Sequence, residues 1–215
     1  MTEHAGPRAS VRPGFSREDW NERYGSADLL WTAEPNRRFA AEAGGLAPGR
    51  ALDVACGEGR NAVWLAEQGW TVTAVDFSDV ALAKAERLAA ARGVSIEWVL
   101  DDVFAYRPPP RSFDLVALLY LQLRREELVV ALSAAAAAVA PGGTIFVLGH
   151  DTTNLTDGYG GPKDVAVLFT PEDVVPWLGD LVVERAEKVE RTVTRADGEA
   201  VAIDALVRAR RSSWL

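Results

Sequence analysis

The chain has 215 residues, of which 48% are hydrophobic and 25% charged, which suits one large globular domain. Its formal net charge of −8 argues against nucleic acid as the main partner, because phosphate binding needs clustered lysine and arginine. A single cysteine excludes an internal disulfide, and two histidines with one cysteine cannot form a common zinc site. The sequence shows no apolar run of membrane-spanning length and no signal-peptide core. We therefore expect a cytoplasmic protein without a membrane partner or a metal.

The chain is predicted to divide near residue 14. Residues 1–14 are polar and contain prolines, which predicts a disordered tail. Residues 15–215 are predicted to form one domain. Its first part, residues 15–45, is rich in aromatic residues and precedes the first strand, and a helix is expected to begin after Ser16, a good N-cap residue.

Two interpretations fit the side chains of segment 15–45. In the first, the segment is a helical cap that packs its aromatic residues on the edge of a sheet. In the second it is a lid, and Tyr24, Trp31 and Arg37 reach a cofactor or substrate. The sequence leaves both open.

A strand, a glycine turn and a helix follow. Residues 51–55 form an apolar run typical of a buried strand, Gly57 and Gly59 come next, and helical spacing begins at Ala62. Glycine lets the backbone turn sharply and approach a ligand closely. This βα unit is therefore predicted to bind a nucleotide-containing ligand.

Two carboxylates indicate the charge of that ligand. Asp53 lies in the strand and Glu58 inside the turn, where they would repel a pyrophosphate and attract an ammonium and a sulfonium. S-adenosylmethionine carries both cations. The glycine pattern of residues 57–62 also allows a dinucleotide-dependent dehydrogenase, so that alternative stays open. Cys56 is expected to pack rather than to act as a nucleophile, because no histidine is near it in sequence and the two carboxylates would raise its thiol pKa.

Strands and helices alternate along the remainder of the chain, which predicts an α/β fold. The predicted strands are residues 71–75, 94–100, 112–120 and 144–149, and the predicted helices are 62–69, 79–91 and 126–140. Two β-rich runs, 181–194 and 200–210, are joined around Asp197-Gly198, a strong hairpin signal.

Two polar residues follow predicted strands. Asp76 lies about 20 residues after Gly57, where α/β nucleotide folds place an acid that binds the ribose hydroxyls. Ser78 can cap the next helix, which leaves Asp76 free for that role, although such an aspartate is often only a turn residue. His150 comes at the sheet edge where ligands bind, as a general base or as a packed loop residue. The glycine-rich loop around Tyr159 is predicted to be a mobile substrate lid.

These features together resemble class I S-adenosylmethionine-dependent methyltransferases over residues 15–211. The motifs that carry the resemblance are Leu52-Asp53-x-x-Cys56-Gly57-x-Gly59-Arg60-Asn61, Asp76, Asp102-Val103, Phe113-Asp114-Leu115-Val116 and Pro141-Gly142-Gly143. The glycine motif followed by Trp64-Leu65-Ala66-Glu67-Gln68-Gly69-Trp70 is most similar to the tellurite-resistance and thiopurine S-methyltransferase-like branch. The resemblance implies a Rossmann-like, doubly wound sheet of seven strands in the order 3-2-1-4-5-7-6, with the last strand antiparallel.

The resemblance also implies roles for single residues. Asp53, Gly57 and Gly59 would hold the methionine end of the cofactor, and the carbonyl of Leu119 would meet its ammonium. Asp102 would accept a hydrogen bond from the adenine amine, while the N–H of Val103 would meet a ring nitrogen. The full set of expected cofactor-binding residues is Tyr24, Trp31, Asp53, Ala55, Gly57, Gly59, Arg60, Asn61, Asp76, Phe77, Asp102, Val103 and Leu119. The family more often has glycine at the position of Ala55, and alanine is small enough for the same place.

We therefore expect an enzyme that transfers the methyl group of S-adenosylmethionine to a small-molecule acceptor. A soft sulfur, selenium or tellurium nucleophile is favoured, since it needs no base, whereas an oxygen or nitrogen acceptor would use His150. A non-catalytic S-adenosylmethionine-binding protein and an NAD(P)-dependent oxidoreductase remain as alternatives. The sequence does not determine the oligomeric state.

Overall fold

The computed structural model describes residues 16–195 and 198–213. The predicted tail, residues 1–14, lies outside this part of the chain. Phe15, residues 196–197 and residues 214–215 lie outside it as well.

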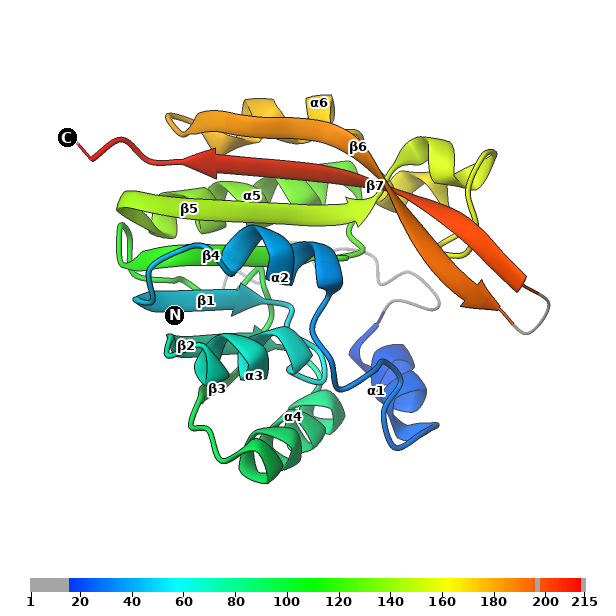
Figure 1. Cartoon of the computed structure of the whole chain (residues 1–215), viewed down its shortest axis with the longest axis horizontal. Coiled ribbons are helices and arrows are strands. Elements are labelled where there is room, and N and C mark those ends of the chain that lie inside the picture. The colour runs from blue at the N-terminus through cyan, green and yellow to red at the C-terminus, as the bar shows by residue number, and fades with distance from the viewer. Residues whose placement is uncertain (1–15, 196–197, 214–215) are drawn as a thin grey trace, which may run out of the picture.

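One seven-stranded sheet runs through the molecule (Figure 1). Its strands are β1 Arg50–Val54, β2 Thr71–Asp76, β3 Glu97–Leu100, β4 Phe113–Leu119, β5 Val139–His150, β6 Val182–Arg195 and β7 Gly198–Arg210. The order across the sheet is β3-β2-β1-β4-β5-β7-β6. Strands β1 to β5 are parallel, and β7 is antiparallel to both of its neighbours. The implied α/β fold, strand order and antiparallel last strand are confirmed.

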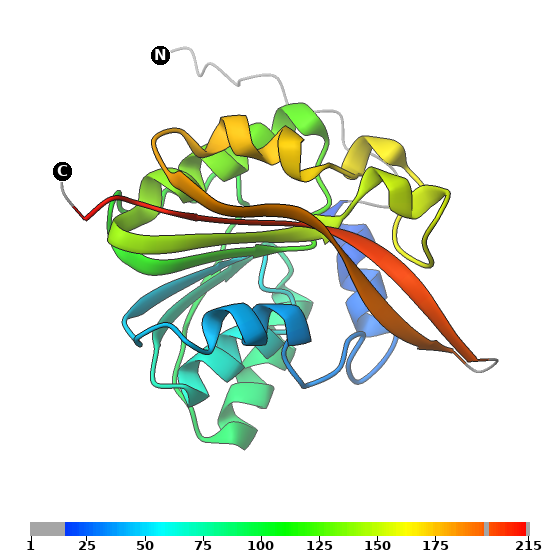
Figure 2. The ribbon, with the colours of Figure 1, turned by 45° about the horizontal axis from the view of Figure 1, so that its top comes forward.

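Helices cover both faces of the sheet (Figure 2). The helices are α1 Arg17–Gly25, α2 Arg37–Ala43, α3 Arg60–Glu67, α4 Asp79–Arg92, α5 Arg125–Ala138 and α6 Pro171–Val174, with short 3₁₀ turns η1 Thr152–Leu155, η2 Val165–Val167 and η3 Val175–Leu178. Helices α2, α3 and α4 lie on one face, and α5 and α6 lie on the other, while α1 stands beside the ends of the strands.

Each face of the sheet has its own hydrophobic core. Leu115 of β4 packs with Phe39 and Leu65 on the side of α2 and α3. Its neighbour Val116 packs with Leu132 of α5 on the other side. Successive residues of a strand point to opposite faces, so a strand covered on both sides must be apolar throughout. This explains the uninterrupted apolar run of β4.

Local signals start and end the helices as expected. Ser16 forms a capping box with Asp19, in which Asp19 N donates to Ser16 Oγ at 3.0 Å and Ser16 N donates to Asp19 Oδ2 at 2.9 Å. Ser78 caps α4 by accepting the N–H of Ala81 at 3.0 Å. Gly93 ends α4 in the left-handed conformation, with φ of 69°.

Several boundaries differ from the prediction, and the largest differences are at β3 and at the start of β5. Strand β3 begins at Glu97, so residues 94–96 are not part of it. Helix α5 ends at Ala138, and β5 already begins at Val139, before the predicted stop. The pairing of β4 with β5 shifts register after Phe113, which accommodates the glycine segment. A Cβ on Gly143 would lie 2.8 Å from the carbonyl oxygen of Phe113, so only glycine allows this close approach of the two strands.

Strands β6 and β7 form a long hairpin that extends beyond the end of the sheet (Figure 1). Their pairing runs from Val182 opposite Arg210 to Arg195 opposite Gly198. The two predicted β-rich runs are confirmed as strands, while the turn residue Asp197 lies outside the described residues. The projecting part of the hairpin lies over the carboxyl ends of the parallel strands, on the same side as α1.

Within residues 16–195 and 198–213, no helix is both long and apolar enough to cross a membrane. In the same part of the chain, no group of three or more histidine, cysteine, aspartate or glutamate side chains is arranged to hold a metal ion.

Candidate active site

A cleft of about 2120 Å³ opens at the carboxyl ends of the parallel strands. Its walls come from α1 and the segment after it, from the glycine turn, and from the β6–β7 hairpin. Open α/β sheets bind their ligands at this edge. Pockets for one small ligand measure roughly 300–1,000 Å³, so the cleft has room for a cofactor together with a second molecule.

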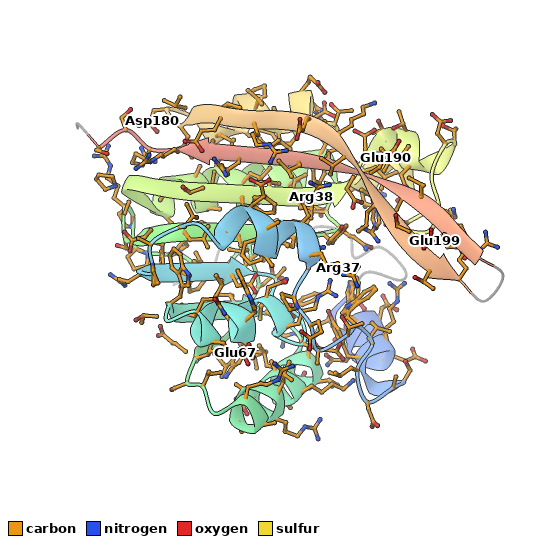
Figure 3. All side chains as sticks on the ribbon, viewed as in Figure 1. Arg37, Arg38, Glu67, Asp180, Glu190 and Glu199 are labelled. Carbon is orange, nitrogen blue, oxygen red and sulfur yellow. The ribbon has the colours of Figure 1, made fainter. Side chains whose placement is uncertain are left out.

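The sequence-predicted site residues meet in this cleft, with one exception. Those that line it are Tyr24, Trp31, Arg37, Asp53, Ala55, Gly57, Arg60, Asn61, Asp76, Phe77, Asp102, Val103, Leu119, His150 and Tyr159. Arg37 stands at the start of α2, on the side that faces α1 (Figure 3). Gly59 does not line the cleft. A Cβ on Gly59 would lie 2.7 Å from the side chains of Ala85 and Trp98, so this glycine is needed for packing.

The turn after β1 contains two residues with positive φ that line the cleft. Gly57 has φ of 56°, and a Cβ there would lie 2.8 Å from the hydroxyl oxygen of Tyr24. Ala55 has φ of 58°, a left-handed conformation that costs a non-glycine residue about 1–2 kcal/mol. The turn therefore requires glycine at 57 and tolerates a small side chain at 55.

Asp53 has an unusual environment. Its side chain is only 2% exposed, and its Oδ2 atom has no hydrogen-bond partner among the described residues. Burial raises the pKa of Asp53 to about 7, and the nearby Asp76 adds to the rise, while Arg60 opposes it. A buried carboxylate of this kind is costly unless a ligand supplies a positive charge.

Arg60 complements Asp53 in the same cleft. Its guanidinium donates to Thr32 Oγ1 at 3.5 Å and forms no ion pair with a described residue. Burial lowers the pKa of Arg60, and the charge of Arg191 lowers it further, whereas Asp53 raises it. The cleft thus holds a carboxylate and a guanidinium that can both form further hydrogen bonds and ion pairs with a ligand.

Glu58, unlike Asp53, forms an ion pair within the protein. It is 3% exposed, and its carboxylate forms an ion pair with Lys84, with Nζ 3.0 Å from Oε1. The same carboxylate accepts the backbone N–H groups of Leu30 at 2.9 Å and Trp31 at 3.0 Å. The sequence argument assigned both carboxylates to a cationic ligand, but the charge of Glu58 is already neutralised within the protein.

The segment between α1 and α2 is tied to helices α3 and α4. Lys84 donates to the carbonyl oxygens of Tyr24 and Ala27. Asn61 accepts the backbone N–H of Asn36 at 2.8 Å, which holds the start of α2. The aromatic segment is therefore both packed against the domain and part of the cleft wall, so the two interpretations of its role are not exclusive.

Asp76 is buried at the end of β2, where it accepts hydrogen bonds from the turn after β1 and from the turn after β2. Its Oδ2 accepts the N–H of Gly57 at 2.8 Å, and its Oδ1 accepts the N–H of Ser78 at 2.9 Å. Asp76 is therefore a turn residue, the alternative that the sequence left open, and Ser78 caps α4 as predicted. Both oxygens retain a second lone pair, and the carboxyl group lines the cleft. Burial raises the pKa of Asp76.

Asp102 and Cys56 occupy the adjoining turns. Asp102 accepts the N–H of Phe104 at 2.9 Å and lines the cleft with Val103. Cys56 is buried, and burial together with Asp76 and Asp53 raises its thiol pKa well above the ordinary value. Because a nucleophilic cysteine needs a lowered pKa, this environment suits packing.

Asp204 of β7 was not singled out in the sequence. It is 1% exposed and accepts hydrogen bonds from the Tyr120 hydroxyl at 2.7 Å and from Arg191 Nε at 2.8 Å. Its Oδ1 lies 3.2 Å from His150 Nδ1. The sequence does carry one signal for this residue, because Asp204 is a charged side chain within the apolar run of residues 200–207. The signal does not reveal the partner, since Asp204 faces His150 only when β5 pairs with β7.

The electrostatics keep Asp204 ionised. Burial raises the pKa of Asp204, but the contacts from His150, Arg191 and Tyr120 outweigh burial, so the pKa lies below its ordinary value. Burial also raises the pKa of the Tyr120 hydroxyl. Tyr120 has φ of 57°, and its ring centroid lies 5.0 Å from that of His150. Such strained residues cost roughly 1–3 kcal/mol and tend to occur at functional sites.

Comparison with known proteins agrees with this geometry. Residues 51–143 match the family model of a methyltransferase domain. This segment is similar to methyltransferase domains. The matched residues include the glycine turn, Asp76, Asp102 and β4, so they supply much of the wall of the cleft.

The chain is also similar to proteins that are named methyltransferases. The chain is 36% identical over 124 residues to demethylmenaquinone methyltransferase of Thermus thermophilus, which covers 57% of this chain and 54% of that protein. It spans about half the length of the curated relatives it matches. Among solved structures, TehB from Haemophilus influenzae has a TM-score of 0.71 and 18% identity, covering 91% of this chain and 67% of that one. The N-methyltransferase NodS from Bradyrhizobium japonicum, in complex with S-adenosyl-L-homocysteine, has a TM-score of 0.68 and 19% identity, covering 91% and 98%. Both structures share the fold of this chain.

Proposed function

We propose that the protein transfers the methyl group of S-adenosylmethionine to a small-molecule acceptor. The observation that carries this proposal is the pair of Asp53, a buried carboxylate with an unpartnered oxygen, and Arg60, a guanidinium without an ion pair among the described residues. An amino acid end, with its ammonium and carboxylate, complements both groups at once. When bound, the cofactor supplies a methyl group that its sulfonium has already activated.

We propose that each group of residues in the cleft binds a different part of the cofactor. Asp53 and the carbonyl of Leu119 would bind the ammonium, while Arg60 would bind the carboxylate. Asp76 would accept from the ribose hydroxyls, and Asp102 with the N–H of Val103 would bind the adenine. The residues proposed to shape the walls around these groups are Tyr24, Trp31, Ala55, Gly57, Asn61 and Phe77. Gly59 would act only through the shape of the turn.

The alternatives fit the cleft less well. The pyrophosphate of a dinucleotide would lie beside the buried carboxylate of Asp53, whose Oδ2 has no partner among the described residues, and this unfavourable contact opposes an NAD(P)-dependent oxidoreductase. A protein that only binds the cofactor needs neither the remaining space of the cleft nor the polar cluster around Asp204.

Two observations bear on the class of the methyl acceptor. Resemblance to the tellurite-resistance and thiopurine S-methyltransferase-like branch supports a soft sulfur, selenium or tellurium nucleophile. The carboxylate beside His150 supports an acceptor that must lose a proton. The net charge of −8 disfavours a nucleic acid acceptor, and a cytoplasmic location stays a prediction of the sequence.

Ligand-dependent thermal stability tests the cofactor. At a concentration of 100 times Kd, S-adenosyl-L-homocysteine should stabilise the fold by about 2.7 kcal/mol, which raises Tm by roughly 5–10 °C for a domain of this size. NAD and NADP should give no shift. The variant Asp53→Asn should lose the shift, and Glu199→Gln, a charge change far out on the hairpin (Figure 3), should keep it. Stabilisation by NAD or NADP in place of S-adenosyl-L-homocysteine would refute the proposal.

A further inference from the structure

We propose that Asp204 positions His150 to remove the proton of an aromatic hydroxyl group, which makes the acceptor a phenol. This inference rests on the proposed methyl transfer and names its acceptor. His150 is then the general base, and Asp204 acts through it. The argument depends on the strand pairing, on the charge of Asp204 and on the side chains that line the cleft with His150.

The sheet sets the contact between the two residues. His150 and Asp204 are directly opposite each other on the antiparallel strands β5 and β7. Side chains at opposed positions share one face of the sheet and lie close together. Because regular strands carry both residues, their separation does not depend on the conformation of the loop after β5.

The carboxylate determines which imidazole nitrogen can accept a proton. Asp204 stays ionised, and its Oδ1 lies 3.2 Å from Nδ1 of His150, a buried nitrogen that forms no hydrogen bond of regular geometry with the described residues and has this carboxylate beside it. A neutral imidazole beside a carboxylate keeps its proton on the near nitrogen, which leaves the lone pair on Nε2. A Cβ on Gly161 would lie 2.9 Å from Nε2 and 3.0 Å from Cε1, so the absence of a side chain at Gly161 leaves room for this ring position.

The cleft that His150 lines suits an aromatic hydroxyl. Trp31 is 47% exposed and Tyr159 is 43% exposed, and both line the cleft, where their rings can pack on a planar acceptor. Arg191 also lines the cleft, and its side chain is 36% exposed despite its bonds to Asp204. Its positive charge would stabilise the negative oxygen that forms when a phenol loses its proton.

The reaction balances with these residues alone as proton carriers. The O–H bond of the phenol breaks, and the proton moves to Nε2 of His150. The electron pair left on oxygen forms the new O–CH₃ bond. The electron pair of the S–CH₃ bond that breaks remains on sulfur, which becomes neutral. His150 then releases the proton to water, and Asp204 stays ionised throughout.

The imidazole tautomer tests the positioning role without any acceptor. The chain has two histidines, so protein labelled with ¹⁵N-histidine gives a simple spectrum, and a His4→Ala variant assigns it. At pH 8.5 we expect His150 to show a protonated Nδ1 and an unprotonated Nε2. In Asp204→Asn the Nδ1–H form should lose its preference, whereas Glu199→Gln should match the wild type. An Nε2–H tautomer in the wild type would overturn the inference, and this measurement needs no variant to fold.

Turnover tests the acceptor class. The probes are phenol, catechol, aniline and benzenethiol, with release of S-adenosyl-L-homocysteine as the signal. We expect methylation of the phenols, with kcat reduced on the order of 100-fold or more in Asp204→Asn and KM changed little. Turnover of aniline or benzenethiol without the phenols, or wild-type kcat in Asp204→Asn, would overturn the inference. Failure of all four probes to react would overturn the assignment of a phenol acceptor, and the tautomer reports separately on whether Asp204 positions His150.

A separate binding measurement distinguishes the two proposals. Asp204→Asn should bind S-adenosyl-L-homocysteine with an affinity within about twofold of the wild type, since Asp204 is not among the proposed cofactor contacts. If the wild type itself does not bind this compound, the proposed function fails. The tautomer then still reports on the relationship of Asp204 and His150.

Discussion

Lys84 Nζ lies 3.0 Å from Glu58 Oε1, in an ion pair whose side chains are only 8% and 3% exposed. This pair joins α4 to the glycine turn, and both residues also hold the backbone of segment 24–31. The aromatic wall of the cleft therefore depends on the same turn that is proposed to bind the cofactor.

The ion pair leads to a first prediction. Lys84→Met should destabilise the fold by about 3–5 kcal/mol, because it leaves the carboxylate of Glu58 buried without its cation. Urea denaturation measures this change. The double variant Lys84→Met with Glu58→Gln should recover part of the loss, since no unpaired charge remains. Equal stability of the single and double variants would contradict this account.

Segment 24–31, whose backbone Lys84 holds, leads to a second prediction. In Lys84→Met, limited proteolysis should cut between α1 and α2 faster than in the wild type, because Tyr24 and Ala27 lose the donor to their carbonyl oxygens. S-adenosyl-L-homocysteine should bind at least several-fold more weakly. Lys163→Met, an exposed lysine change outside this network, should leave the cutting rate unchanged.

Asp53 leads to a third prediction, on stability. Its folded pKa of about 7 lies above the ordinary value of 3.8, so the folded state binds a proton more tightly than the unfolded state between these values. This contribution is fully present below pH 4 and is lost as pH rises through 7. Ligand-free Asp53→Asn should therefore exceed the wild type in stability at pH 8, by up to on the order of 4 kcal/mol, and match it below pH 4. An unchanged difference across this range would contradict the raised pKa.

The same group leads to a fourth prediction, on binding. A carboxylate binds an ammonium only when it is ionised, so the affinity for S-adenosyl-L-homocysteine should fall as pH drops below about 7, approaching tenfold per unit. Calorimetry in buffers of different ionisation enthalpy should detect proton release near pH 6. Asp53→Asn should bind weakly at every pH, without this dependence.

Gly57 leads to a fifth prediction. Gly57→Ala places a Cβ 2.8 Å from the Tyr24 hydroxyl and also requires an alanine with φ of 56°. We expect a loss of about 2 kcal/mol or more, measured by urea denaturation. Adding Tyr24→Phe removes the nearest atom and should restore part of the stability, but not the part caused by the backbone. Complete restoration would show that backbone strain is negligible here.

The sequence determined the local elements of this protein. The alternation of apolar strands and helices, the caps at Ser16 and Ser78, and the βα turn with Gly57 all depend on residues close together in the chain. Hydrogen bonds within a helix, side-chain alternation in a strand and the backbone freedom of glycine act over a few residues, so a pattern in the sequence reveals them. The strand order followed from resemblance to a known family, not from these local rules.

Only the tertiary structure decided how the charged residues are used. Asp53 and Glu58 look alike in the sequence, yet Glu58 meets Lys84, which is 26 residues away, while Oδ2 of Asp53 has no partner in the described part of the chain. Asp204 faces His150 only because β7 pairs with β5 in one register. The energy of a charge depends on its burial and on the partners within a few ångströms. Those partners come from distant parts of the chain, and the folded sheet alone brings them together.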